Sequence, residues 1–123
     1  MAAPCDIYRK HYICKVLYSG SAMIDVSQLE ERAHEVATML RALANERRLI
    51  LLCRLAEVGE ASVGALAEAT ELGQPIVSQQ LAVLREEGLV AHRREGQSLH
   101  YRIDDARVET LLKACQAAFC PPD

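Results

Sequence analysis

Apolar residues recur at helical spacing through the middle of the chain and divide it into successive helices. Ser27 and Glu30 form a capping-box pair, so a first helix is predicted to open there. Asn45 is a good N-cap for a second helix, which Gly59 closes, and Ser62 is the predicted N-cap of a short third helix. The stripes that these helices bury are predicted to be Leu29, Ala33, Val36, Leu40 and Leu43, then Leu49, Leu52, Cys53 and Ala56, then Val63, Leu66 and Ala67.

A fourth helix follows a tight turn over residues 71–73. It is predicted to begin with Pro75, because the missing N–H of proline is not needed in the first turn of a helix, and Gly88 ends it. Its buried stripe is predicted to be Val77, Leu81 and Leu84.

Two short strand-like runs and a last helix complete the chain. The runs cover 89–91 and 99–103, and residues 95–97, Glu-Gly-Gln, carry a hairpin signal. The acidic pair 104–105 caps the last helix, which Pro121 and its proline neighbour stop. The apolar face of this helix is predicted to be Val108, Leu111, Leu112, Cys115 and Phe119. The fold class is therefore mainly α with a β-hairpin wing, the layout of a winged helix-turn-helix.

Residues 1–22 differ in composition from the rest. They hold three of the four tyrosines and two of the three lysines, and a Ser-Gly-Ser break at 19–21 follows. We expect them to be an N-terminal extension, either a flexible arm or the result of an upstream start codon with Met23 as the natural first residue. Residues 23–123 are then one winged helix-turn-helix domain.

Composition and charge narrow the class of protein. Half of the 123 residues are hydrophobic, tryptophan is absent and Phe119 is the one phenylalanine, which predicts an aliphatic core. The net charge of −3 argues against a protein that coats nucleic acid non-specifically, but it leaves room for a local basic patch. No run approaches the roughly 18 apolar residues of a membrane span, and the N-terminus does not resemble a signal peptide.

The five cysteines are odd in number and widely spaced, and no Cys-x-x-Cys occurs. This pattern argues against a secreted disulfide framework and favours thiols in the cytoplasm, available for metal binding or redox chemistry. They are Cys5, Cys14, Cys53, Cys115 and Cys120.

The exposed face of the fourth helix has the side chains of a DNA-reading helix. Glutamine pairs bidentately with adenine, and serine bonds bases or phosphates. The hairpin adds basic and polar groups for phosphates or the minor groove. The predicted DNA contacts are Gln74, Pro75, Ser78 and Gln79 on the helix and His92, Arg93, Arg94 and Gln97 on the hairpin, with small Ala82 allowing close approach. The alternative is a polar face that meets only water, and the joint pattern of helix pair and wing favours DNA.

Four segments together resemble the ArsR family of winged-helix repressors: LRALANERRLILLC, SVGALAEAT, GQPIVSQQLAVLREEGLV and the hairpin ending in YRI. The likeness covers roughly residues 25 to 120. It implies a cytoplasmic homodimer that binds an inverted repeat in operator DNA and is released by an inducer. It also implies that the first and last helices form the dimer interface.

Metal-sensing relatives carry sites that this chain lacks. The third helix has no Cys-x-Cys motif, and the last helix offers Asp104 and Asp105 at its start but no histidine after His100. A zinc site of histidines and carboxylates cannot be built from these residues, so we expect no metal and no cofactor.

The resemblance is closer to the BigR/SqrR/HlyU-like subgroup of persulfide and redox sensors. Its members share a cysteine at the end of the apolar run in the second helix and another near the end of the last helix, matched here by Cys53 and Cys120. The resemblance implies that the reduced dimer binds DNA and that reactive sulfur species or oxidants link the two thiols and release it. The controlled genes would serve sulfide detoxification.

Periodicity alone leaves other roles open for the thiols. Cys53 falls on an apolar stripe, where a cysteine is often a small core residue, and Cys115 reads as core or dimer interface. Cys120 lies off that stripe at a helix end, where a thiol is accessible. Cys5 and Cys14 lie in the extension, where simple exposure explains them.

Three alternatives compete with the sulfur switch. An arsenite- or antimonite-responsive repressor would bind the metalloid with Cys53, Cys115 and Cys120. A thiol enzyme is disfavoured, because local spacing places no histidine or acid beside a cysteine to activate it, so we expect no catalytic residues. A plain dimerisation module would show no salt-sensitive operator binding.

Overall fold

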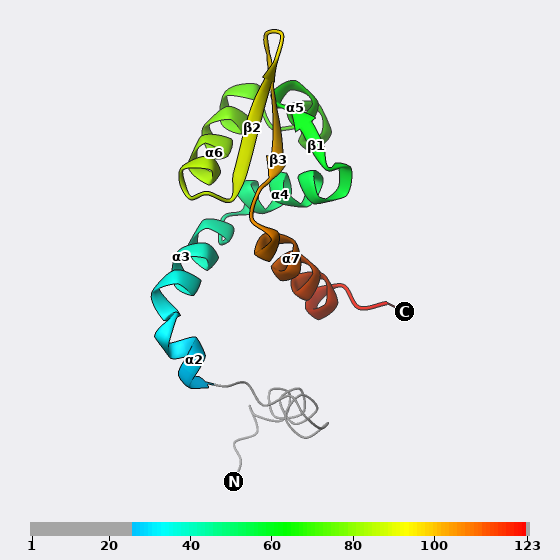
Figure 1. Ribbon diagram of the computed structural model, residues 1–123. Helices are drawn as coiled ribbons and strands as arrows, with labels where there is room; N and C mark the ends of the chain where they lie inside the picture. The colour runs from blue at the N-terminus through cyan, green and yellow to red at the C-terminus, as the bar shows by residue number, and fades with distance from the viewer. Residues whose placement is uncertain (1–25, 123) are drawn as a thin grey trace. The chain divides into compact units, whose positions relative to one another are not determined.

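The computed structural model describes residues 26–122 (Figure 1). The elements are α2 (Val26–Glu31), α3 (Ala33–Leu43), α4 (Glu46–Val58), β1 (Glu60–Ser62), α5 (Val63–Thr70), α6 (Gln74–Glu86), β2 (Val90–Glu95), β3 (Ser98–Ile103) and α7 (Ala106–Phe119). The chain divides into two units after Val36. The predicted extension, with Cys5 and Cys14, lies outside the described residues.

The predicted first helix is in fact two helices. The first of them, α2, begins at Val26, one residue before Ser27. The stripe predicted for this segment is largely exposed: Leu29 and Leu40 each keep 47% of their surface open to solvent, and the side chains buried in the core are Met39, Ala42 and Leu43. An amphipathic helix whose apolar stripe faces solvent leaves that stripe free for another surface.

The predicted helix ends are mostly confirmed. The side chains of Asn45 and Ser62 each accept a hydrogen bond from the backbone N–H three residues on, at 3.1 Å, and Asp105 accepts one from two residues on, at 3.0 Å. Gly59 ends α4 with φ at +90°, a conformation that a side chain would strain. Pro75 is the second residue of α6, after Gln74, one place later than predicted.

The sheet has one strand more than the predicted hairpin. Its order is β1-β3-β2, and both pairings are antiparallel. The strands β2 and β3 are joined by a two-residue turn in which Gly96 has φ at +64°, and the hairpin extends past the neighbouring helices (Figure 1). With six helices and this hairpin among the described residues, the structure confirms a mainly helical fold with a β wing.

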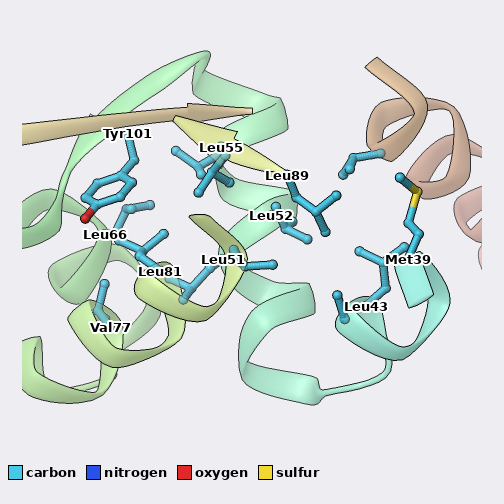
Figure 2. Close-up of a cluster of buried hydrophobic side chains, with 14 residues drawn as sticks. Met39, Leu43, Leu51, Leu52, Leu55, Leu66, Val77, Leu81, Leu89 and Tyr101 are labelled. Carbon is cyan, nitrogen blue, oxygen red and sulfur yellow. The ribbon is translucent and has the colours of Figure 1, made fainter. Parts of the chain in front are cut away.

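The core is aliphatic, as composition predicted (Figure 2). On α6 the predicted stripe of Val77, Leu81 and Leu84 is fully buried. The fully or almost fully buried side chains from the rest of the domain include Leu51, Leu52, Leu55, Leu66, Leu89, Val90, Tyr101 and Val108.

The predicted buried faces of α4 and α7 need correction. On α4 the core takes Leu51, Leu52 and Leu55, whereas Cys53 is exposed. On α7 only Val108 is buried. Each helix therefore has apolar residues on a face that the core does not cover. Among the described residues, no helix is long and apolar enough to cross a membrane.

Candidate functional site

The outer face of α6 presents the polar residues predicted to read DNA. Gln74, Pro75, Ser78 and Gln79 are all exposed, as is the small Ala82. The opposite face is anchored in the core by its leucines and valine, so α6 is held firmly while its polar side stays open. A helix held in this way can enter the major groove with amide and hydroxyl groups in front.

His92 does not lie at the hairpin tip, where the sequence placed it. It lies near the base of β2, half-buried, and its ring packs against Tyr101 with the two centroids 5.1 Å apart. Its Nε2 contacts the guanidinium of Arg85 on α6, and its Nδ1 is buried without a partner among the described residues. These contacts tie the wing to the last turn of α6.

The two wing arginines have different surroundings. Arg93 forms a two-pronged pair with Glu60 of β1, at 2.7 and 3.0 Å, and its Nη1 lies 3.7 Å from Glu95. Arg94 is exposed, and no ion pair holds it within residues 26–122. Since successive side chains of a strand point to opposite faces, Arg94 shares the face of His92, which contacts α6. Of the four predicted wing contacts, Arg94 and Gln97 in the turn are therefore the two that are exposed and have no side-chain partner among residues 26–122.

The Arg93–Glu60 pair has an electrostatic signature. The hydrogen bond from Arg93 lowers the pKa of the Glu60 carboxyl below its usual range, and the same bond raises the pKa of Arg93. The pair fixes β1 to β2 across the sheet, so Arg93 has a partner in the protein before any DNA is present.

Arg48 connects α3 and α4 to α6, the helix predicted to read DNA, which we call the recognition helix. Its Nε donates to the carbonyl of Ala42 at the end of α3, at 2.7 Å, and its Nη1 donates to Gln80 Oε1 on α6, at 3.0 Å. Its backbone N–H donates to the Asn45 cap. Arg48 thus links the end of α3 and the start of α4 to α6.

A cavity of about 810 Å³ lies between α4 and α7. Apolar side chains and three cysteines line it, with charged groups from both helices. Its lining residues are Leu49, Cys53, Arg54, Ala56 and Glu57 on α4, and Glu109, Leu112, Lys113, Cys115, Gln116, Phe119 and Cys120 on α7. We call this the thiol cavity. It is formed by the apolar faces of α4 and α7 that the core leaves uncovered.

The thiols of this cavity are all free and exposed. Partial burial raises the pKa of the Cys53 thiol, and the charge of Cys115 raises it further. Cys120 is the residue at which α7 ends, and its N–H donates to the Gln116 carbonyl at 2.8 Å. Within the part of the chain that the structure describes, no three histidine, cysteine or acidic side chains are grouped closely enough to hold a metal ion.

Sequence reasoning missed two residues at these sites, Glu60 and Arg48. It named Cys115 as core or dimer interface and, in the metalloid alternative, as a sulfur ligand. The register that pairs β1 with β3 is what brings Glu60 to Arg93, and a three-residue strand leaves no periodicity to find it by. Arg48 lies three residues after the N-cap Asn45, which places it in the first turn of α4. Its hydrogen bond to Gln80 joins residues far apart in the sequence, so no local pattern predicts it.

A protein-family match, individual relatives and a solved structure all point to the same kind of protein. Residues 45–92 match the family described as bacterial regulatory protein, arsR family. The chain is 45% identical to the "Biofilm growth-associated repressor" of Agrobacterium fabrum over 81% of this chain and 85% of that protein. It is 36% identical to the "Transcriptional activator HlyU" of Vibrio cholerae over 84% of this chain and 94% of that protein.

A solved structure gives the same answer. The transcriptional repressor BigR from Xylella fastidiosa superposes with a TM-score of 0.75 at 43% identity, over 79% of this chain and 98% of that one. The relatives of this chain named above are transcriptional regulators, which agrees with the prediction that the protein is not an enzyme. The chain belongs to the arsR family of DNA-binding bacterial regulatory proteins.

Proposed function

We propose that this protein is a dithiol-switched transcriptional repressor. As a reduced homodimer in the cytoplasm it binds operator DNA, and it releases the operator when reactive sulfur species or oxidants bridge Cys53 and Cys120. The genes it controls serve sulfide detoxification. Repression is supported by the relative at 45% identity and by the solved structure with a TM-score of 0.75, both of which are named repressors, although the relative at 36% identity is named an activator.

The observation that carries the proposal is the shared cavity of Cys53 and Cys120. The two residues come from α4 and from the end of α7, and the fold brings both to the lining of the thiol cavity. Both are free thiols and both are exposed, so a small sulfur donor can reach them. Nothing in their spacing along the chain required that they share a cavity.

The chemistry needs one persulfide and two thiols. One thiolate attacks the outer sulfur of R–S–SH, takes it as Cys–S–SH and releases R–SH. The second thiolate then attacks the protein sulfur of that persulfide, forms the disulfide and expels hydrogen sulfide. The two cysteines are oxidised and the transferred sulfur is reduced, so no further oxidant is required.

A bridge between α4 and α7 can reach the DNA-binding face through packed elements. Arg48 joins the start of α4 to Gln80 of α6, so a tilt of α4 is carried to the recognition helix. In the proposed homodimer α2, α3 and α7 form the interface, and the half-sites lie roughly 34 Å apart on the DNA. A change in the spacing of two recognition helices therefore lowers operator affinity.

The surroundings of the predicted contacts support two different roles in DNA binding. Gln74, Pro75, Ser78 and Gln79 on α6 enter the major groove, and Arg94 with Gln97 reaches the phosphates or the minor groove. His92 supports the wing through Tyr101 and Arg85, and Arg93 supports it through Glu60. These two residues act on DNA binding through the position of the hairpin.

A repressor that senses trivalent arsenic or antimony is the second candidate. Its support is that Cys53, Cys115 and Cys120 line one cavity, which gives a soft metalloid three sulfur ligands within reach. Against it, no three such side chains among residues 26–122 are close enough for an ion as the chain stands. Metalloid binding would require α7 to close onto α4.

One experiment separates the candidates. Reduced protein is treated separately with an organic persulfide, peroxide and arsenite, and operator binding and intact mass are then measured. Release by the persulfide, with loss of two hydrogens or gain of sulfur atoms, supports the dithiol switch. Release by arsenite alone would contradict it and favour the metalloid sensor.

A further inference from the structure

Cys115 has no role in the pair of thiols proposed above, yet it lies in the same cavity as both. It comes three residues after Leu112 and four before Phe119, which also line the cavity, so it lies on the face of α7 turned toward α4. Its charge contributes to raising the pKa of the Cys53 thiol, which requires the two sulfurs to be near each other.

The two thiols of α7 are held differently. Cys115 lies within the helix, whereas Cys120 stands at its end, after the last helical residue and before two prolines. They are separated by about 140° around the axis of an α-helix. Cys115 is therefore fixed opposite α4, whereas Cys120 is carried by the end of α7, and of these two thiols it is Cys115 whose charge raises the pKa of Cys53.

We propose that Cys115 is the resolving thiol of the switch, which closes a first bridge with Cys53 that Cys120 then takes over by exchange. This rests on the proposed function, and it replaces a two-thiol switch with a relay of three. The role that it adds is that of a first disulfide partner for Cys53 at Cys115.

Each step of the relay balances. The Cys53 thiolate takes the outer sulfur of the organic persulfide and releases the carrier thiol. The Cys115 thiolate attacks Cys53 Sγ, forms the Cys53–Cys115 disulfide and expels hydrogen sulfide. The Cys120 thiolate then attacks Cys53 Sγ of that disulfide, giving the Cys53–Cys120 bridge and returning Cys115 as a thiol.

The relay has a kinetic reason. A thiol held on the facing helix has a high effective concentration toward a persulfide on Cys53, so it reacts before a thiol that must wait for a helix end to move. Rapid closure also protects the Cys53 persulfide from reduction by other thiols. The slower exchange with Cys120 then couples the chemistry to the end of α7.

The test uses full-length protein with Cys5→Ser and Cys14→Ser as the background. That background and its Cys115→Ser and Cys120→Ser variants are reduced, mixed with glutathione persulfide and quenched with an alkylating agent at successive times. Intact mass and peptide mapping then follow the Cys53 persulfide and each bridge. Operator binding of every reduced variant serves as the control for folding.

The relay predicts that Cys115→Ser slows the second step and leaves the first step unslowed. The Cys53 persulfide forms at least as fast as in the background protein, because a charged neighbour has been removed. It then accumulates, because without a nearby thiol the bridge closes about tenfold or more slowly. In Cys120→Ser a Cys53–Cys115 bridge forms at close to the background rate. Closure of the Cys53–Cys120 bridge at the background rate in Cys115→Ser would overturn the relay, as would a lasting persulfide in Cys120→Ser.

Failure of the relay is distinguishable from failure of the proposed function. If the background protein bridges Cys53 to Cys120 and leaves the operator, and Cys115→Ser does so equally fast, only the relay is wrong. If the background protein forms no bridge and stays on the operator, the dithiol switch itself is wrong.

Discussion

At the scale of the residue, neighbours along the chain have different roles. Arg93 and Arg94 are adjacent, but strand geometry turns them to opposite faces and only Arg93 meets a carboxylate, that of Glu60. The sequence predicted both as DNA contacts because alternation within a short polar run is invisible until the sheet register is known. Cys53 is a second case. Periodicity placed it on an apolar stripe of α4, but it could not show which side of that helix the core covers.

The wing arginines give the first prediction. Arg94→Gln is expected to weaken operator binding on all sequences and to lower the slope of log affinity against log salt by about 1, since one phosphate contact is lost. The matched variant Arg93→Gln is expected to change that slope little, because its guanidinium is already paired. Fluorescence anisotropy over a salt series measures both. Equal slopes for Arg94→Gln and the unmodified protein would refute the assignment.

The second prediction concerns the pH dependence of Cys53. The thiolate is the reactive form, and the pKa of Cys53 is raised by burial and by Cys115, so the reactive fraction is small at neutral pH. In a variant whose other cysteines are serine, alkylation of Cys53 is expected to rise about tenfold per pH unit through neutral pH. Replacing Cys115 removes one cause of the shift, so the variant that keeps Cys115 should react more slowly. A rate that levels off near neutral pH would show a lowered pKa instead.

At the scale of the element, the helices were predictable because their ends carry local signals. Asn45, Ser62 and Asp105 cap their helices through side-chain bonds that depend only on near neighbours. The strand β1 was missed because its pairing partner, β3, lies far along the chain. The stripe on α4 was misassigned because that helix is apolar on two sides, and only packing decides which side enters the core.

Arg48 provides the prediction at this scale. Arg48→Met is expected to lower the free energy of unfolding by about 1 to 3 kcal/mol, because two backbone carbonyls and Gln80 lose a charged donor. Urea unfolding at constant m-value measures the loss. Arg47→Met, at an exposed neighbouring position, is the control and should cost little. A stability equal to that of the control would mean that these hydrogen bonds do not hold α3, α4 and α6 together.

At the scale of the whole molecule, surface left uncovered points to assembly. Leu40 is 47% exposed and Phe119 is 83% exposed, although both lie on apolar faces of helices. The order of the elements along the chain was enough to predict the fold class. An interface with a second copy is harder to predict, because in a single chain its sign is exposed apolar surface of this kind. The thiol cavity likewise could not be foreseen, because it depends on how α4 and α7 pack.

The proposed homodimer predicts that charge on these faces separates the subunits. Leu40→Asp and Phe119→Asp are each expected to weaken self-association by about 2 kcal/mol or more, as for a buried interface anchor, and to weaken operator binding with it. Val58→Asp is the control, since Val58 is 59% exposed but lies at the end of α4. Sedimentation over a concentration series measures the association. A dimer that survives both changes would place the interface elsewhere.

The dithiol switch requires that a sulfur bridge through Cys53 releases the protein from DNA. The most direct measurement is operator occupancy of Cys53→Ser beside the unmodified protein, both reduced and then treated with an organic persulfide. The unmodified protein is expected to leave the operator as its bridge forms, while Cys53→Ser is expected to stay bound with equal affinity before and after treatment. Release of Cys53→Ser at the same persulfide dose would contradict it.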